Sequence, residues 1–169
     1  LLMEVWGRRT EAIAARVPGI QYVLPFENRG AEVGVTLHHP HGQIYAYPHV
    51  PPIPQRMHDS ERAHFEANGR PLLAGLIEAE LRDGRRMLHA SEEAVAFVPA
   101  WARYPYECWV APRRQVPDFA ALADAERMAL ARALLTVLRK YDALWNMAFP
   151  YIMVWYQAPR LPCYAAACH

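Results

Sequence analysis

Apolar positions at the start of the chain recur with the period of a helix. The residues that fall near one helical face are Met3, Trp6, Ile13 and Val17. Pro18 and Gly19 follow this run, and a proline followed by a glycine is a typical helix end. The pattern therefore predicts a first helix over residues 1–17.

Strict alternation of apolar and polar side chains replaces the helical period in the next two runs. The first run covers residues 20–26 and finishes in the turn signal at residues 28–30, and the second covers residues 43–49. Alternation is typical of half-buried strands, so we predict two neighbouring strands, the first ending near Phe26. Residues 48–54 hold so many prolines that we predict irregular structure there. We place the boundary between the two lobes of the chain in this segment.

Helical and extended patterns continue beyond that boundary. One helix is predicted to begin at Asp59 or Ser60 and to run to Leu81, with an interruption near residues 68–71. A longer helix is predicted from Asp118 to Trp145. Its expected core stripe is Leu122, Met128, Leu135, Leu138 and Leu144. Short strand-like runs lie at residues 85–90, 93–99, 106–112 and 150–159. The predicted fold class is α+β with mainly antiparallel strands.

Composition excludes several classes of protein. The 169 residues are 53% hydrophobic and 21% charged, with a net charge of +1, so no strong field draws the chain to nucleic acid or to a membrane surface. No apolar run approaches the roughly 18 residues of a membrane span. The three cysteines, Cys108, Cys163 and Cys168, show no disulfide framework. We expect a cytoplasmic protein with small-molecule partners.

The candidate chemistry is concentrated at residues 37–43, Leu-His-His-Pro-His-Gly-Gln. In an extended chain His39 and His41 point to the same face and His38 points away. A neutral imidazole acts as a nucleophile or as a metal ligand, and both roles are open at this point. Gly42 permits close backbone approach and Gln43 offers amide donors, which suits an anionic ligand.

These residues resemble the galactose-1-phosphate uridylyltransferase family of the histidine triad superfamily, whose signature is His-Pro-His-Gly-Gln. The resemblance includes FENRG at 26–30 and GVTLHHPHGQIYAYP at 34–48, and it continues in order to about residue 160 through VAFVPAWARYPYE, LRKYDALW and FPYIMVWYQAP. It implies a histidine-triad-like α+β fold. Residues 1–52 would be the C-terminal part of an incomplete first lobe, and residues 53–169 a second, nearly complete lobe truncated at its end.

The resemblance also implies a reaction. A histidine, here His41, would attack the α-phosphorus of UDP-glucose, release glucose 1-phosphate, and pass UMP to galactose 1-phosphate. Gln43 would donate hydrogen bonds to the nonbridging phosphate oxygens. Asn28 and Thr36 would contact the ribose and phosphate side of the nucleotide. The family also implies a homodimer.

Metal sites of the family are altered in this chain. Many members hold a structural zinc through a Cys-x-x-Cys pair and two histidines, one of which corresponds to His39. This chain has no Cys-x-x-Cys, so zinc at His39 depends on ligands from a missing N-terminal part. Met57 and Tyr156 occupy positions where iron-binding relatives carry a glutamate and a histidine. We therefore expect no iron.

The ends of the chain depart most from the family. The resemblance begins at the last helix of the first lobe and stops before the final strand of the second. The tail at 160–169 matches nothing in the family, and it is either a loose tail or a metal site at Cys163, Cys168 and His169. We expect a C-terminal half-protein that folds poorly alone.

Three functional hypotheses follow. The first is the catalytic half of a uridylyltransferase that needs a separate N-terminal chain. The second is an inactive relic or a nucleotide-binding fragment. The third is an adenylyltransferase or a nucleotide hydrolase of the superfamily. Hydrolase relatives carry another histidine at the position of Gln43, so the glutamine favours transfer over hydrolysis.

Overall fold

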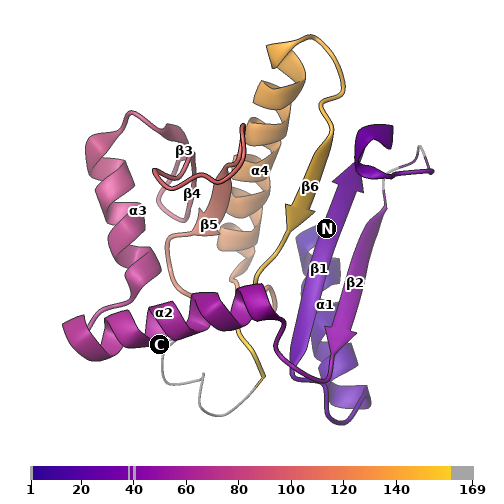
Figure 1. Ribbon diagram of the computed structural model, residues 1–169, viewed down its shortest axis with the longest axis vertical. Helices are drawn as coiled ribbons and strands as arrows, with labels where there is room; N and C mark the ends of the chain where they lie inside the picture. The colour runs from indigo at the N-terminus through magenta and orange to yellow at the C-terminus, as the bar shows by residue number, and fades with distance from the viewer. Residues whose placement is uncertain (1, 38, 40, 161–169) are drawn as a thin grey trace.

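Helices and two small antiparallel sheets make up the chain (Figure 1). The computed structural model describes residues 2–37, 39 and 41–160. The predicted α+β class with mainly antiparallel strands is confirmed. His38, Pro40 and residues 161–169 lie outside the described residues, so the loose tail and its alternative, metal binding by Cys163, Cys168 and His169, both stay predictions.

The first sheet has the strand order β2-β1-β6. Its central strand β1 (Tyr22–Arg29) is antiparallel both to β2 (Gly42–Tyr47) and to β6 (Tyr151–Val154). The two alternating runs are thus neighbouring strands, as predicted, but β1 continues past Phe26 to Arg29 because β6 pairs with its end. This sheet joins residues from both sides of the predicted internal boundary.

Helix α1 (Leu2–Arg16) covers one face of the first sheet. Met3 and Trp6 are buried, and Trp6 lies against the rings of Phe119 and Trp155 at centroid distances of 5.6 and 6.0 Å. Val17 follows the helix end and is exposed, so its predicted place on the apolar face is wrong. The buried face of α1 therefore does not extend to Val17. Within the helix, Trp6 contacts Gly42 at the start of β2.

Helix α2 (Pro52–Asn68) begins earlier than predicted, inside the proline-rich segment. The expectation of irregular structure up to Pro54 is wrong because the first turn of a helix tolerates proline, whose missing N–H has no helical partner there. The interruption before α3 (Leu72–Asp83) is as predicted. Gly69 ends α2 with φ of +65°, a left-handed conformation that favours glycine.

The second sheet has the order β3-β4-β5 and lies between two helices (Figure 1). Its strands β3 (Met87–Ala90), β4 (Ala94–Phe97) and β5 (Trp109–Pro112) match three predicted runs. The central strand β4 is wholly buried. Its alternate residues face opposite sides, with Val95 and Phe97 toward α3 and with Ala94 and Ala96 toward α4.

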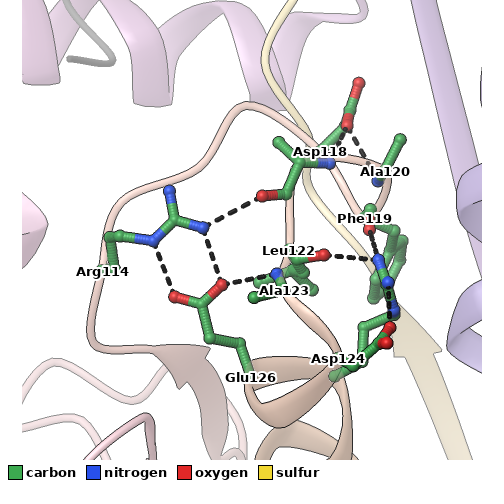
Figure 2. A network of polar contacts seen from close by, with 10 residues as sticks. Arg114, Asp118, Phe119, Ala120, Leu122, Ala123, Asp124 and Glu126 are labelled. Atoms are coloured by element: carbon green, nitrogen blue, oxygen red, sulfur yellow. Dashed lines mark hydrogen bonds and ion pairs between the residues drawn. The ribbon is translucent and has the colours of Figure 1, made fainter.

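Helix α4 (Asp124–Leu144) starts after the predicted Asp118. Asp118 instead accepts hydrogen bonds from the main-chain nitrogens of Ala120 and Ala121 and stabilises a turn ahead of the helix (Figure 2). The helix start is held by Glu126, which accepts hydrogen bonds from the main chain of Ala123 and from Arg114 (Figure 2). The turn and the capped helix are therefore separate structures.

The predicted core stripe of α4 is largely wrong. Met128, Leu135 and Leu144 are 56%, 45% and 50% exposed. The apolar residues that α4 buries are Ala129, Leu130, Ala133 and Val137. Small alanines let the helix approach the second sheet closely, which a stripe of leucines does not. Among the described residues, no helix has the length and apolar character that crossing a membrane requires.

Candidate functional site

The segment that contains the three histidines, residues 38–41, comes between the short helix η1 (Ala31–Val33) and β2 in the chain, and we call it the histidine segment. His41 directly precedes Gly42, the first residue of β2. A Cβ atom on Gly42 would lie 3.2 Å from two atoms of the Trp6 indole. Gly42 therefore permits the close approach of Trp6. This packing holds the start of β2, which follows the histidines.

The register of β1 and β2 defines which side chains share a face. Phe26 is directly opposite Gln43, and Asn28 lies two residues further along β1, so the three side chains point to the same side of the sheet. Ile44 packs on the other side, against the cluster that contains Trp6. Asn28 and Gln43 thus lie on the face turned away from α1.

His41 is half-buried and makes a defined contact with the backbone. Its Nδ1 atom lies 3.0 Å from the main-chain oxygen of His39. A carbonyl oxygen only accepts, so Nδ1 carries the proton in this contact, and in the neutral imidazole the lone pair is then on Nε2. The contact leaves Nε2 of His41 as a candidate nucleophile.

His39 is exposed, and its ring centroid lies 5.7 Å from that of His41. The two rings are close, as the sequence predicts, although His39 lies in a bend and not in a strand. Within the described ranges, no group of three or more His, Cys, Asp or Glu side chains is arranged to hold a metal ion. The described residues alone therefore do not fit zinc, and His39 as a ligand stays a prediction.

Asn28 carries a polar atom without a partner. Its Oδ1 is buried, and no described residue donates a hydrogen bond to it. An unsatisfied buried acceptor costs about 1 to 3 kcal/mol. A donor from a ligand or from another part of the protein would relieve that cost. Thr36, in contrast, is exposed in the loop before the histidines.

Two hollows of about 230 and 270 Å³ lie away from this face. The first is lined by α1 and residues near the start of α4, and the second lies where α2 and α3 meet. Neither is lined by a residue of the histidine segment. The candidate site is therefore an open sheet face in the described part of the chain, and not one of these two hollows.

The sequence did not predict the contacts of Glu27 and Arg29, which point from β1 to the sheet face opposite Asn28. Tyr151 donates a 2.6 Å hydrogen bond to Glu27, and the guanidinium of Arg29 contacts Asp142 and the carbonyl oxygen of Phe149. Burial and the bond to Glu27 raise the pKa of Tyr151, and the bond from Arg29 lowers the pKa of Asp142. Arg29 and Asp142 are far apart in sequence, so no local pattern indicates their contact.

Comparisons with known proteins agree with the resemblance. The model of the galactose-1-phosphate uridyl transferase C-terminal domain matches residues 57–166, and that of the N-terminal domain matches residues 2–51. The expectation that the tail at 160–169 matches nothing in the family is therefore wrong for residues 160–166. The galactose-1-phosphate uridylyltransferase of Streptomyces lividans is 41% identical over 94% of this chain and 46% of its own length. That of Thermotoga maritima is 36% identical over 94% of this chain and 49% of its own.

Solved structures show the same fold. A uridylyltransferase mutant is 31% identical and superposes with a TM-score of 0.86, covering 95% of this chain and 52% of its own. An ADP-glucose phosphorylase from Arabidopsis thaliana, solved with bound ADP-glucose, has a TM-score of 0.83 at 27% identity and covers 99% of this chain and 52% of its own.

The fold is therefore that of the uridylyltransferase class. More specifically, the chain belongs to the galactose-1-phosphate uridylyltransferase family. It spans about half the length of the curated relatives that it matches.

Proposed function

We propose that this chain supplies the nucleophile for uridylyl transfer from UDP-glucose to galactose 1-phosphate. The observation that carries the proposal is the contact between His41 Nδ1 and the main-chain oxygen of His39. It favours the tautomer in which Nε2 is the free nitrogen, and it holds the direction of the ring. Membership of the family supplies the substrate class.

The first step joins Nε2 of His41 to the α-phosphorus of UDP-glucose. The bond from that phosphorus to the bridging oxygen breaks, and glucose 1-phosphate leaves with the electron pair. The ring then carries a positive charge, and Nδ1 keeps its proton toward the His39 oxygen. In the second step a phosphate oxygen of galactose 1-phosphate attacks the same phosphorus and releases the histidine. Nucleotide transfer thus proceeds through a covalent histidine intermediate.

Gln43 and Asn28 have distinct roles in this proposal. Gln43 follows the nucleophile by two residues, and its amide N–H groups donate to the nonbridging oxygens that gain charge in the transition state. A neutral donor of this kind leaves the imidazole unprotonated. Asn28 offers its buried Oδ1 to a ribose hydroxyl, which supplies the missing donor. Thr36 contacts the phosphate side from the preceding loop.

Zinc binding in this proposal depends on the part of the longer relatives that this chain does not match. His39 binds zinc only when cysteine or histidine ligands come from the part that the chain does not contain, on the same polypeptide or on another chain. Zinc would then anchor the segment before the nucleophile. A homodimer, a cytoplasmic location and the absence of iron are further expectations from the family.

Uridylyl exchange tests the proposal. This chain is combined with the segment of the Streptomyces lividans relative that precedes the matched region, and we call the mixture the supplemented preparation. UDP-glucose and galactose 1-phosphate should yield UDP-galactose and glucose 1-phosphate. Loss of the product in His41→Ala, but not in His49→Ala, is expected. His49 is the matched control because it lies beyond the other end of β2.

Adenylyl transfer is the second candidate, favoured by the structural likeness to the ADP-glucose phosphorylase. The same preparation is given ADP-glucose in parallel. A faster reaction with ADP-glucose than with UDP-glucose would support adenylyl transfer and contradict the uridylyl assignment. Absence of both reactions, with both chains shown to be folded together, would support the inactive relic.

A further inference from the structure

Strand β1 is held unevenly at the end that carries Asn28. Its pairing with β2 ends at Glu27 opposite Gly42, whereas its pairing with β6 continues to Arg29 opposite Tyr151. Asn28 and Arg29 therefore have a strand neighbour on one side only, within the described residues. Gly30 follows with φ of +107° as the chain leaves the sheet.

Contacts on the back face compensate for the missing neighbour. Residues on either side of Asn28 point away from the candidate site, because side chains alternate along a strand. Glu27 accepts a 2.6 Å hydrogen bond from the hydroxyl of Tyr151. Arg29 lies with its guanidinium carbon 4.9 Å from the centre of the Tyr151 ring. Both neighbours of Asn28 are thus anchored to β6.

Arg29 is also tied to the end of α4. Its Nε donates to the carbonyl oxygen of Phe149 at 2.9 Å, and its Nη1 donates to Asp142 at 3.2 Å. Its Nη2 contacts both partners. Asp142 in turn accepts a 2.9 Å hydrogen bond from the main-chain nitrogen of Phe149. One guanidinium and one carboxylate therefore close a ring of contacts between β1 and the segment that leads into β6.

We propose that Arg29 and Asp142 are positioning residues that hold Asn28 in place on the nucleotide face. The inference rests on the proposed function, since it assigns Asn28 to the nucleotide. The side chain of Arg29 lies on the back of the sheet, opposite the face that carries Asn28, and it contacts Asp142 there. The pair fixes the backbone at the end of β1 that does not pair with β2 in the described residues, and this holds the side chain of Asn28 on the front of the sheet.

Kinetics in the supplemented preparation provide the first test. Arg29→Met keeps the aliphatic stem and removes the fork, and Asp142→Asn removes the charge. Each should raise the KM for UDP-glucose about tenfold, with kcat changed less than about threefold. Arg29→Lys should recover part of the loss, and the double variant should be little worse than either single variant. Arg8→Met is the matched control, because Arg8 lies on α1 and forms an exposed 3.8 Å pair with Glu4.

A second readout does not depend on activity. The chain has three asparagines, Asn28, Asn68 and Asn146, so selective 15N labelling of asparagine in this chain gives few side-chain amide signals. Asn28→Asp identifies the signal of Asn28. That signal should shift or broaden in Arg29→Met and Asp142→Asn, and it should stay in place in Arg8→Met.

The two readouts separate the two proposals. If the wild-type preparation transfers no UMP, the proposed function fails, and the Asn28 signal still decides whether Arg29 and Asp142 hold that residue. An unmoved Asn28 signal in both variants would overturn the positioning role. A fall in kcat at constant KM in folded variants would overturn it as well, because the pair would then act on the chemical step.

Discussion

The Nδ1 atom of His41 lies 3.0 Å from the main-chain oxygen of His39, two residues earlier in the chain. One local contact thus sets both the tautomer and the direction of the ring, since the carbonyl oxygen accepts and the opposite nitrogen is left free. The same short segment offers the exposed His39 ring as a separate ligand. Nucleophile and metal ligand are the two roles that the sequence leaves open, and the assignment of the first to His41 and of the second to His39 stays a prediction.

Replacing Gly42 with alanine should destabilise the fold. The new Cβ would lie 3.2 Å from the indole of Trp6, which is 2% exposed and is packed against Phe119 and Trp155. The indole has little room to move, so we expect a loss of about 1 to 3 kcal/mol in the free energy of unfolding. Denaturant unfolding of the supplemented preparation measures it.

Alanine at Gly34 is the control for this prediction. Gly34 has φ of +82°, but a Cβ there meets nothing within 4 Å, so the control reports backbone strain without a clash. Adding Trp6→Phe should relieve part of the loss caused by Gly42→Ala. Equal losses with and without the smaller ring would show that Trp6 is not the reason for the glycine.

Gln43→Ala should slow uridylyl exchange by about 10- to 1000-fold and leave the fold intact, because it removes a donor to the charged phosphate oxygens. Steady-state rates of the supplemented preparation measure the effect. Gln21→Ala is the matched control, since Gln21 precedes the other end of β1. An unchanged rate in Gln43→Ala would mean that this amide does not meet the phosphate.

The helix start at Glu126 should make stability depend on pH. The hydrogen bonds from Arg114, at 2.7 and 2.6 Å, lower the pKa of Glu126 in the folded chain. A lowered carboxyl pKa stabilises the fold above the unfolded value of about 4.3, and this contribution is lost as the pH falls through the folded pKa. Unfolding followed from pH 7 downward should therefore show stability falling below about pH 4.3.

Two variants test this contribution. Glu126→Gln should flatten the acid side of the stability profile, and Glu126→Ala should lower stability at pH 7 by about 1 kcal/mol, because it also removes the bond to the Ala123 nitrogen. Glu66→Gln, at an exposed site on α2, is the control and should keep the wild-type profile. If Glu126→Gln has the same dependence of stability on pH as the wild-type chain, Glu126 is not the cause of the loss of stability at acid pH.

The isolated chain should self-associate. Strands β2 and β6 are the edges of the first sheet in the described residues, and Tyr45 and Ile152 on them are 50% and 63% exposed. Exposed apolar edges pair with other chains. Light scattering after gel filtration should show oligomers for this chain alone and a defined complex in the supplemented preparation.

Ile152→Lys should reduce self-association because a charged side chain disfavours edge pairing. Met128→Lys adds the same charge at an exposed position on α4, which is not a strand of this sheet, and should have less effect. A monodisperse monomer of the wild-type chain with a cooperative thermal transition would contradict the prediction.

Local patterns predicted the elements better than the contacts between them. Alternation located β1 and β2, and short runs between turn residues located β3 to β5, because strand periodicity depends on which side chains face the core. The buried face of α4 was predicted wrongly. A sequence shows that leucines recur, but not that Ala133 lies where the helix touches the sheet.

For the candidate site, too, the sequence predicted the local features better than the contacts between distant residues. The histidine segment is local, so its two rings were predicted to lie together. Trp6 behind Gly42 and Asp142 beside Arg29 are contacts between distant parts of the chain. Only the folded topology brings them together, and no spacing in the sequence signals them.

Trapping of the covalent intermediate tests the central claim most directly. The supplemented preparation is given UDP-glucose that is radiolabelled in the uridine, without galactose 1-phosphate, and is then denatured under alkaline conditions. Peptide mapping should find the label on the peptide that contains His41. His41→Ala should abolish it, and His41→Gly should regain part of the transfer when imidazole is added. Label that persists in His41→Ala, or that maps to another peptide of this chain, would contradict the account.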